Sequence, residues 1–369
     1  MHVICQKQLL SEAVMNVGRA VPSKSSLPAL EGIHLKTLDG ALQLSGYDME
    51  MGITTSIKAE IQTAGEIVLS ARLFSDMLRK LSGDTISIEC DEKYLTKIIC
   101  GMTEFTILGT PADEFPELPA VGDGSPLSIP QDKLKSMIDQ TLFAISTSND
   151  KPIHMGSLFN WEQNLLTVVS VDGYRLALRK EPVEGDLDIS FVVPGKTLSE
   201  IGKLLDEEDE DPARLTVSKK HMVCDIGPYS IITRLLEGEF LDYNASIPKD
   251  NTTSVVVSTR ELIDSVERTS LLISDRLRSP LRVTFEENLI KLSCSTAIGK
   301  AYDELGCSLT GQKVEMGFNN KYLLDALKAS GSDQVKLELN GPLSPIKVVP
   351  MEGDDFLFLV LPVRLKNEV

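Results

Sequence analysis

Apolar and polar positions along the chain repeat one strand-to-helix pattern three times. In each copy an apolar run typical of a strand meets a short polar break, after which leucines recur at helical spacing. The three stretches are residues 67–81 (IVLSARLFSDMLRKL), 191–205 (FVVPGKTLSEIGKLL) and 316–330 (MGFNNKYLLDALKAS). Their starts lie 124 and 125 residues apart. The pattern therefore predicts three related units joined end to end.

Each copy also begins with a helix and an antiparallel hairpin. Apolar stripes predict helices at residues 8–17, 133–142 and 261–270. Alternating runs separated by turn residues predict hairpins, which pair residues 32–38 with 41–45, 156–161 with 165–171, and 281–285 with 289–294. We therefore expect an α+β fold of three repeated domains, each with two helices packed on antiparallel sheet. Turn formers gather at residues 111–130 and 248–254 and place the domains at 1–120, 127–250 and 254–369.

A pair of basic residues seven positions apart recurs in the second helix of each copy. Seven residues make two helical turns, so each pair lies on one face, away from the leucines. Such a face is either an ordinary solvated helix surface or a surface that contacts phosphates without reading bases. The pairs are Arg72 with Arg79, Lys196 with Lys203, and Lys321 with Lys328.

Composition limits the possible functions. The 369 residues carry a net charge of −17, which by itself argues against nucleic-acid binding. The acid is concentrated locally, however, as in residues 206–211 (DEEDED). The N-terminus has no signal-peptide pattern and no apolar run is long enough for a bilayer span, so we expect a cytoplasmic protein. Scattered cysteines and histidines predict buried thiols and neither a metal site nor a cofactor.

Motifs of enzymes are weak in this chain. Residues 194–197 (PGKT) follow a strand and precede a helix, but Ser190 stands where a phosphate-binding loop needs its first glycine. Residues 172–175 (DGYR) read either as part of an active site or as a tight turn. We therefore expect no catalytic residues. A nucleotide-dependent enzyme or a protein-only scaffold built on repeated α+β units remains the alternative.

Several motifs, in order along the chain, resemble the bacterial DNA polymerase III beta subunit family, the replicative sliding clamps. They are residues 27–28 (LP), 171–176 (VDGYRL, family pattern T-D-G-H-R-L), 239–243 (EFLDY) and 361–365 (LPVRL). The resemblance implies a homodimer of three-domain protomers that closes head to tail into a ring around duplex DNA. It further implies a processivity factor in DNA replication, which tethers the polymerase and also binds the clamp loader and other clamp-motif proteins.

The resemblance also implies roles for individual residues. Basic positions on the inner helices and loops would contact DNA, and the repeat pattern adds the third pair. These residues are Lys24, Arg72, Arg79, Lys151, Lys196, Lys203, Lys321 and Lys328. The subunit contact would join Phe105 and Ile107 of the first copy to Leu271, Leu272 and Ile273 of the third.

A pocket for partner peptides is the last implied site. Its walls would be His154, Val171, Gly173, Tyr174, Arg175, Leu176, Leu241, Ser246, Leu343, Leu359, Pro362, Val363 and Arg364. Apolar walls suit the leucine or phenylalanine anchors of an extended peptide. The chain departs from the family at Leu241 (usually proline), Ser246 (usually apolar) and Val363 (usually methionine). It also continues beyond Leu365, and Pro152 and Ile153 stand where some members have tyrosines that touch DNA.

Overall fold

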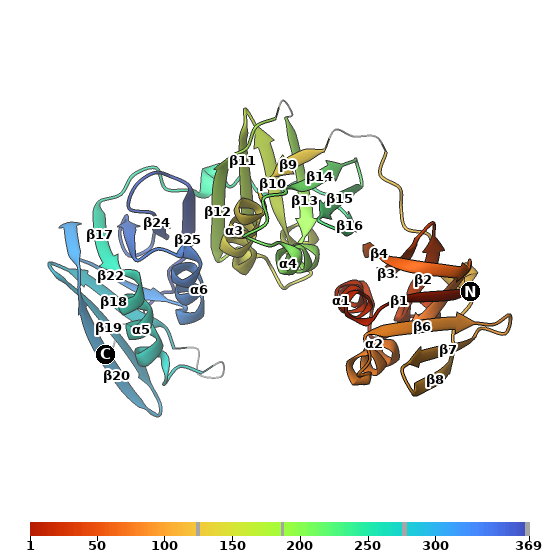
Figure 1. Ribbon diagram of the computed structural model, residues 1–369. Helices are drawn as coiled ribbons and strands as arrows, with labels where there is room; N and C mark the ends of the chain where they lie inside the picture. The colour runs from red at the N-terminus through yellow and green to blue at the C-terminus, as the bar shows by residue number, and fades with distance from the viewer. Residues whose placement is uncertain (123–125, 186–187, 275–278, 366–369) are drawn as a thin grey trace. The chain divides into compact units, whose positions relative to one another are not determined.

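The computed structural model describes residues 1–122, 126–185, 188–274 and 279–365 (Figure 1). The chain forms two compact units, each continuous in space but not in sequence. The first comprises residues 1–134 and 200–235, and the second comprises residues 135–199 and 236–369. Within the described residues no helix is long and apolar enough to cross a membrane.

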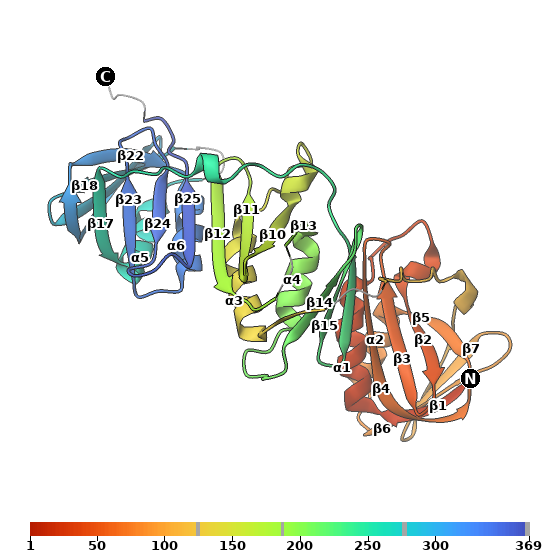
Figure 2. The ribbon, with the colours of Figure 1, turned by 90° about the horizontal axis from the view of Figure 1, so that it is seen from above.

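The first unit contains one 12-stranded antiparallel sheet, with the main order β8-β7-β6-β1-β4-β16-β15-β14-β9 and a branch β5-β2-β3 that joins β4. Helices α1 (Lys7–Val17) and α2 (Ala71–Lys80) lie side by side, and α1 packs on β3 and β4 (Figure 2). The strands are β1 (His2–Gln6), β2 (Gly32–Leu38), β3 (Ala41–Tyr47), β4 (Met51–Thr63), β5 (Glu66–Ser70), β6 (Thr85–Cys90), β7 (Leu95–Cys100), β8 (Thr103–Leu108), β9 (Leu127–Ile129), β14 (Ala213–Val217), β15 (His221–Ile226) and β16 (Tyr229–Arg234).

The second unit contains a nine-stranded sheet, β13-β10-β11-β12-β25-β24-β23-β17-β21, and a four-stranded sheet, β20-β19-β18-β22. Helices α5 (Thr259–Ser270) and α6 (Asn320–Ser330) pack against each other over a core that includes Phe285, Phe318 and Phe358. The strands are β10 (Gly156–Glu162), β11 (Leu165–Val171), β12 (Arg175–Pro182), β13 (Ile189–Pro194), β17 (Thr253–Ser258), β18 (Leu281–Glu286), β19 (Leu289–Thr296), β20 (Gly299–Gly306), β21 (Ser308–Gly311), β22 (Val314–Phe318), β23 (Gln334–Leu339), β24 (Ile346–Val349) and β25 (Phe356–Val360).

The predicted elements are present. The three opening helices are α1, α3 (Gln131–Thr141) and α5, and the three strand-to-helix stretches are β5–α2, β13–α4 (Gly195–Leu204) and β22–α6. The hairpin turns use positive φ where expected, at Gly40 (φ 67°) and Asn288 (φ 64°). The prediction of an α+β fold with three repeats, each with two helices on antiparallel sheet, is confirmed.

Two strand pairings were not predicted, because they join different repeats. β16 pairs with β4, aligning Ile231 with Ile53, and β12 pairs with β25, aligning Ala177 with Phe358. Hydrogen-bonded sheet therefore continues past the expected domain limits. α3 and α4 each contribute residues to both compact units. The boundaries at 1–120, 127–250 and 254–369 stay a prediction.

Candidate functional site

The predicted basic face of α2 is present at the surface. Strand β5 leads directly into α2, whose apolar side buries Phe74, Met77 and Leu78. Arg72 and Arg79 lie on the exposed side. Two helical turns separate them, so both side chains project from one face of the helix.

The other two copies repeat this arrangement. In α4, Leu198 and Ile201 are buried while Lys196 and Lys203 are exposed. In α6, the buried residues include Leu323, Ala326 and Leu327, and the basic residues Lys321 and Lys328 are exposed. The structure thus places all six basic residues on the solvent side of their helices.

An acidic residue lies between the two basic residues of every pair, which the sequence analysis missed. These residues are Asp76, Glu200 and Asp325, each four positions after the first basic residue and three before the second. Residues three and four apart are neighbours on a helix surface. The spacing R/K-x-x-x-D/E-x-x-K/R is therefore visible in the sequence itself, although the basic pairs alone do not indicate it.

The second basic residue of each pair forms an ion pair with a carboxylate. Arg79 forms an ion pair with Asp76, and Nζ of Lys203 lies 2.8 Å from Oε1 of Glu200. In the third copy Nζ of Lys328 lies 2.7 Å from Oε1 of Glu267, which comes from α5. Each of the three helices therefore carries a locally balanced charge at this position.

The two basic loop residues are exposed as well. Lys24 lies between the 3₁₀ turns Gly18–Ala20 and Pro28–Glu31. Lys151 immediately precedes the 3₁₀ turn Pro152–Met155. Both are accessible to a ligand, although neither stands on a helix.

The guanidinium group of Arg175 forms ion pairs with two carboxylates. Its Nε donates to Oδ2 of Asp172 at 2.9 Å, and its Nη1 donates to Asp325 of α6. The guanidinium carbon lies 4.5 Å from the centre of the Tyr322 ring. This side chain therefore fastens the turn between β11 and β12 to α6.

Residues 172–175 form a tight turn, which was one of the two interpretations of their sequence. Oδ1 of Asp172 accepts hydrogen bonds from the backbone N–H groups of Tyr174 (2.9 Å) and Arg175 (3.0 Å). Gly173 has φ +90°, a value that suits glycine. Tyr174 is 61% exposed and stacks on Tyr322 with a ring separation of 6.1 Å. The turn thus presents an aromatic surface next to α6.

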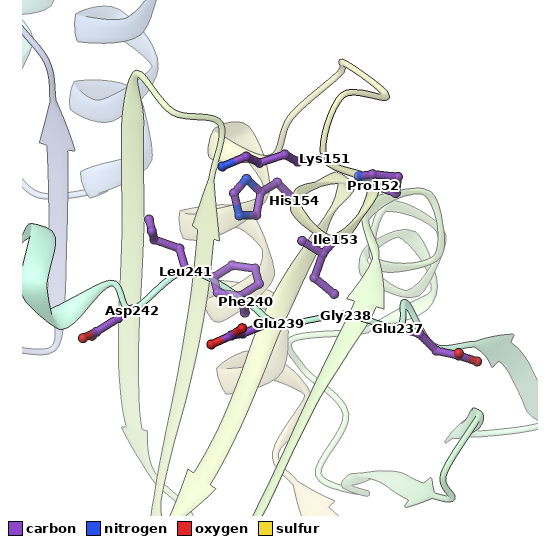
Figure 3. A pocket seen from close by; sticks show the side chains of 10 residues that line it. All are labelled: Lys151, Pro152, Ile153, His154, Glu237, Gly238, Glu239, Phe240, Leu241 and Asp242. Carbon is purple, nitrogen blue, oxygen red and sulfur yellow. The ribbon is translucent and has the colours of Figure 1, made fainter.

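A cavity of about 500 Å³ lies between two segments of the second unit (Figure 3). Of the predicted pocket residues, His154 and Leu241 line it. The His154 ring meets the Phe240 ring edge to face, with centres 5.4 Å apart. Burial, and then the charge of Lys151, lower the pKa of His154. The other lining residues were not predicted for the pocket; they are Lys151, Pro152, Ile153, Glu237, Gly238, Glu239, Phe240 and Asp242.

The other predicted pocket residues are of two kinds. Val171, Leu176 and Leu359 are buried, and the last two belong to an apolar cluster on which Phe240 packs. Ser246, Leu343, Val363 and Arg364 are exposed, whereas Pro362 is half-buried. The backbone N–H of Val363 donates to Gly317 O at 2.8 Å and fixes that segment against β22. Their joint role as one peptide pocket stays a prediction.

The residues predicted for the subunit contact lie at open sheet edges or helix ends. Phe105 and Ile107 are half-buried on β8, the terminal strand of the 12-stranded sheet. Leu271, just after α5, is 82% exposed, whereas Leu272 and Ile273 are half-buried. An open strand edge and a protruding leucine are features that soluble proteins usually cover.

The PGKT segment forms no phosphate loop. Pro194 ends β13 and Gly195 begins α4. A Cβ atom built at Gly195 would lie 2.2 Å from Cδ1 of Ile145 and 3.1 Å from the carbonyl oxygen of Met155. The close approach of Ile145 and Met155 therefore accounts for the glycine at this position.

Fold and exposed basic helices together indicate a binding protein of repeated α+β units. Three family models match, described as the N-terminal domain (residues 1–119), the central domain (128–242) and the C-terminal domain (245–364) of the DNA polymerase III beta subunit. The chain belongs to the DNA polymerase III beta subunit family. This family is one of non-catalytic processivity factors, so the chain is not an enzyme.

Relatives and solved structures agree with this assignment. The chain is 33% identical to the beta sliding clamp of Bacillus subtilis over 377 residues, covering 99% of this chain and 100% of that protein. The crystal structure of the B. subtilis DNA polymerase sliding clamp matches with a TM-score of 0.96 and 32% identity, over 99% of this chain and 100% of that one. The sliding clamp of Pseudomonas aeruginosa, solved with a ligand, matches with a TM-score of 0.93 and 28% identity over 99% and 100% of the two chains.

Proposed function

We propose that the chain is a DNA sliding clamp, which encircles duplex DNA as a homodimeric ring and tethers the replicative polymerase in the cytoplasm. The carrying observation is the exposed basic pair on α2, α4 and α6, kept in a chain whose net charge is −17. Basic side chains without base-reading partners contact phosphates of any sequence. A ring with such a lining is retained by topology, while an acidic remainder keeps DNA off its other surfaces.

Retention by topology gives the decisive experiment. The protein is loaded on nicked circular DNA by a bacterial clamp loader, the circle is then cut once, and bound protein is followed by gel filtration. We expect full retention on the circle and loss after cutting. Protein that stays on the linear DNA would refute the ring, and protein that never loads would favour a protein-only scaffold.

Subunit closure is proposed to use β8 of one protomer and the region after α5 of its partner. Support comes from the open edge of β8, with Phe105 and Ile107, and from the exposure of Leu271. Apolar side chains that remain this exposed in one chain gain stability when a second chain covers them. Sedimentation should therefore show a dimer.

Partner proteins are proposed to bind the second unit through an extended peptide with apolar anchors. The cavity lined by His154, Phe240 and Leu241 offers apolar side chains for such anchors. A fluorescent peptide with leucine and phenylalanine anchors should bind, and Leu241→Ser should weaken it by about 5- to 10-fold, because Leu241 is 39% exposed and available for contact. Leu38→Ser in the first unit, 40% exposed, is the matched control and should leave affinity unchanged.

A further inference from the structure

The acidic residue within each basic pair is a feature of the whole repeat. Asp76, Glu200 and Asp325 occupy the same position in the three repeated helices. On each helix the order along one face is basic, acidic, basic, since the intervals are four and three residues. Acidic residues placed at random in an acidic chain would not be expected at the same helix position in all three repeats.

The third copy keeps the charge balance by a different contact. Its Asp325 binds Arg175 of the β11–β12 turn, so this carboxylate is drawn away from Lys328. Lys328 instead contacts Glu267, which lies on the neighbouring helix α5 and is 2.7 Å away. The second basic residue of every pair is thus matched by a carboxylate, whichever element supplies it.

Stability alone does not account for two of these three pairs. The side chains of Arg79 and Asp76 are 71% and 52% exposed, and those of Lys328 and Glu267 are 54% and 48% exposed. Ion pairs this exposed contribute little to folding, because water and salt screen them. Their recurrence therefore needs another explanation.

We infer that Asp76, Glu200 and Glu267 moderate the attraction between the basic helices and DNA, so that the contacts permit sliding. This inference rests on the proposed function, because it requires the basic helices to face DNA. A phosphate that approaches Arg79 must share it with Asp76 and is repelled by the same carboxylate. Each contact is then weak enough to be exchanged for the next along the duplex.

Neutralising the three carboxylates tests the inference. Asp76→Asn/Glu200→Gln/Glu267→Gln is compared with Glu66→Gln/Glu315→Gln/Asp354→Asn, which removes equal charge from ion pairs with Lys36, Arg282 and Lys180 on strands or loops. Binding of the intact protein to a labelled duplex is measured from about 50 to 200 mM KCl. If three basic residues gain phosphate contacts, the slope of log K against log salt should steepen by about 2.7. Between the lowest and the highest salt concentration, the binding constant of the variant should then fall by about 40-fold more than that of the unchanged protein.

The outcomes separate the inference from the function. If the helix triple variant matches the control triple while Arg79→Ala/Lys203→Ala/Lys328→Ala weakens binding, the inference is overturned and the basic helices still bind DNA. If the alanine variant has no effect, the proposed role of the helices fails instead. Glu200 is only 14% exposed and also lies 3.5 Å from Arg19, so Asp76→Asn/Glu267→Gln serves as a second variant. It should steepen the slope by about 1.8.

Discussion

Arg175 should hold the β11–β12 turn against α6, and its removal should loosen this contact more than the loss of its partner Asp325. Three variants perturb this contact to different degrees. Arg175→Ala removes the guanidinium group, Arg175→Lys keeps only its positive charge, and Asp325→Asn removes the charge of one carboxylate partner. The Arg175 side chain is 12% exposed, as against 11% for Asp172 and 42% for Asp325. Burial therefore differs sharply between its two ion pairs.

The expected magnitudes follow from that burial. Breaking a buried pair costs about 3–5 kcal/mol. We expect about 3 kcal/mol for Arg175→Ala, because the carboxylate of Asp172 keeps two backbone N–H donors. Asp325→Asn should cost about 0.5–1 kcal/mol, since that partner is well solvated. Arg175→Lys should fall between, at about 1–2 kcal/mol, because lysine lacks the planar group that stacks on Tyr322.

Hydrogen exchange of the Leu361 amide is a local measure of how firmly the β11–β12 turn is held. That N–H donates to the carbonyl oxygen of Tyr174 at 2.9 Å, so it reports opening of the turn from the C-terminal segment. Its protection should fall in the order Asp325→Asn, Arg175→Lys, Arg175→Ala, by about tenfold for each 1.4 kcal/mol. Equal protection in Arg175→Ala and the unchanged protein, or a larger effect of Asp325→Asn, would contradict the reasoning.

Three further changes have directional outcomes. Leu271→Lys should shift the dimer toward single protomers in sedimentation, because it places a charge on a leucine that is 82% exposed, and an unchanged dimer would argue against this contact. Gly156→Ala should lower stability by about 3 kcal/mol in urea unfolding, since its Cβ would lie 2.2 Å from the Val193 carbonyl oxygen. Hydrogen bonds from Lys291 and Lys313 lower the pKa of Glu286 from 4.5 to about 2. Its stabilisation is thus present above pH 4.5 and lost as pH falls toward about 2, so Glu286→Gln should flatten the fall of Tm in that window.

The helices were predictable because their burial follows a simple period. Phe74, Met77 and Leu78 recur at intervals that only a helix brings to one side, and the structure begins α2 at Ala71, directly after the expected strand. Local repetition strengthened each assignment, since a pattern present three times is less ambiguous than one present once. The order of secondary structure in the chain thus depends mainly on local sequence.

Contacts between segments that are distant in the sequence were not predictable in the same way. Arg175 and Asp325 are 150 positions apart, and no periodicity relates them. The pairing of β12 with β25 likewise depends on two strand edges meeting in three dimensions. The cavity next to His154 arises from residues 151–154 and 237–242, which become neighbours only after the sheet has formed. Such features depend on tertiary packing, which a single sequence does not encode locally.

The third repeat shows which property of the basic helices is retained. Its central acidic residue, Asp325, forms an ion pair with Arg175. Lys328 nevertheless has a carboxylate within ion-pair distance, which Glu267 of α5 supplies. If the shared requirement were an ion pair between positions i and i+3 of one helix, the third copy would have lost that pair and would need no carboxylate from another helix. Because the replacement comes from another helix, the shared requirement is the charge at the surface rather than the stability of one helix. The balance of charge, and not the basic residues alone, is therefore the feature that the three repeats have in common.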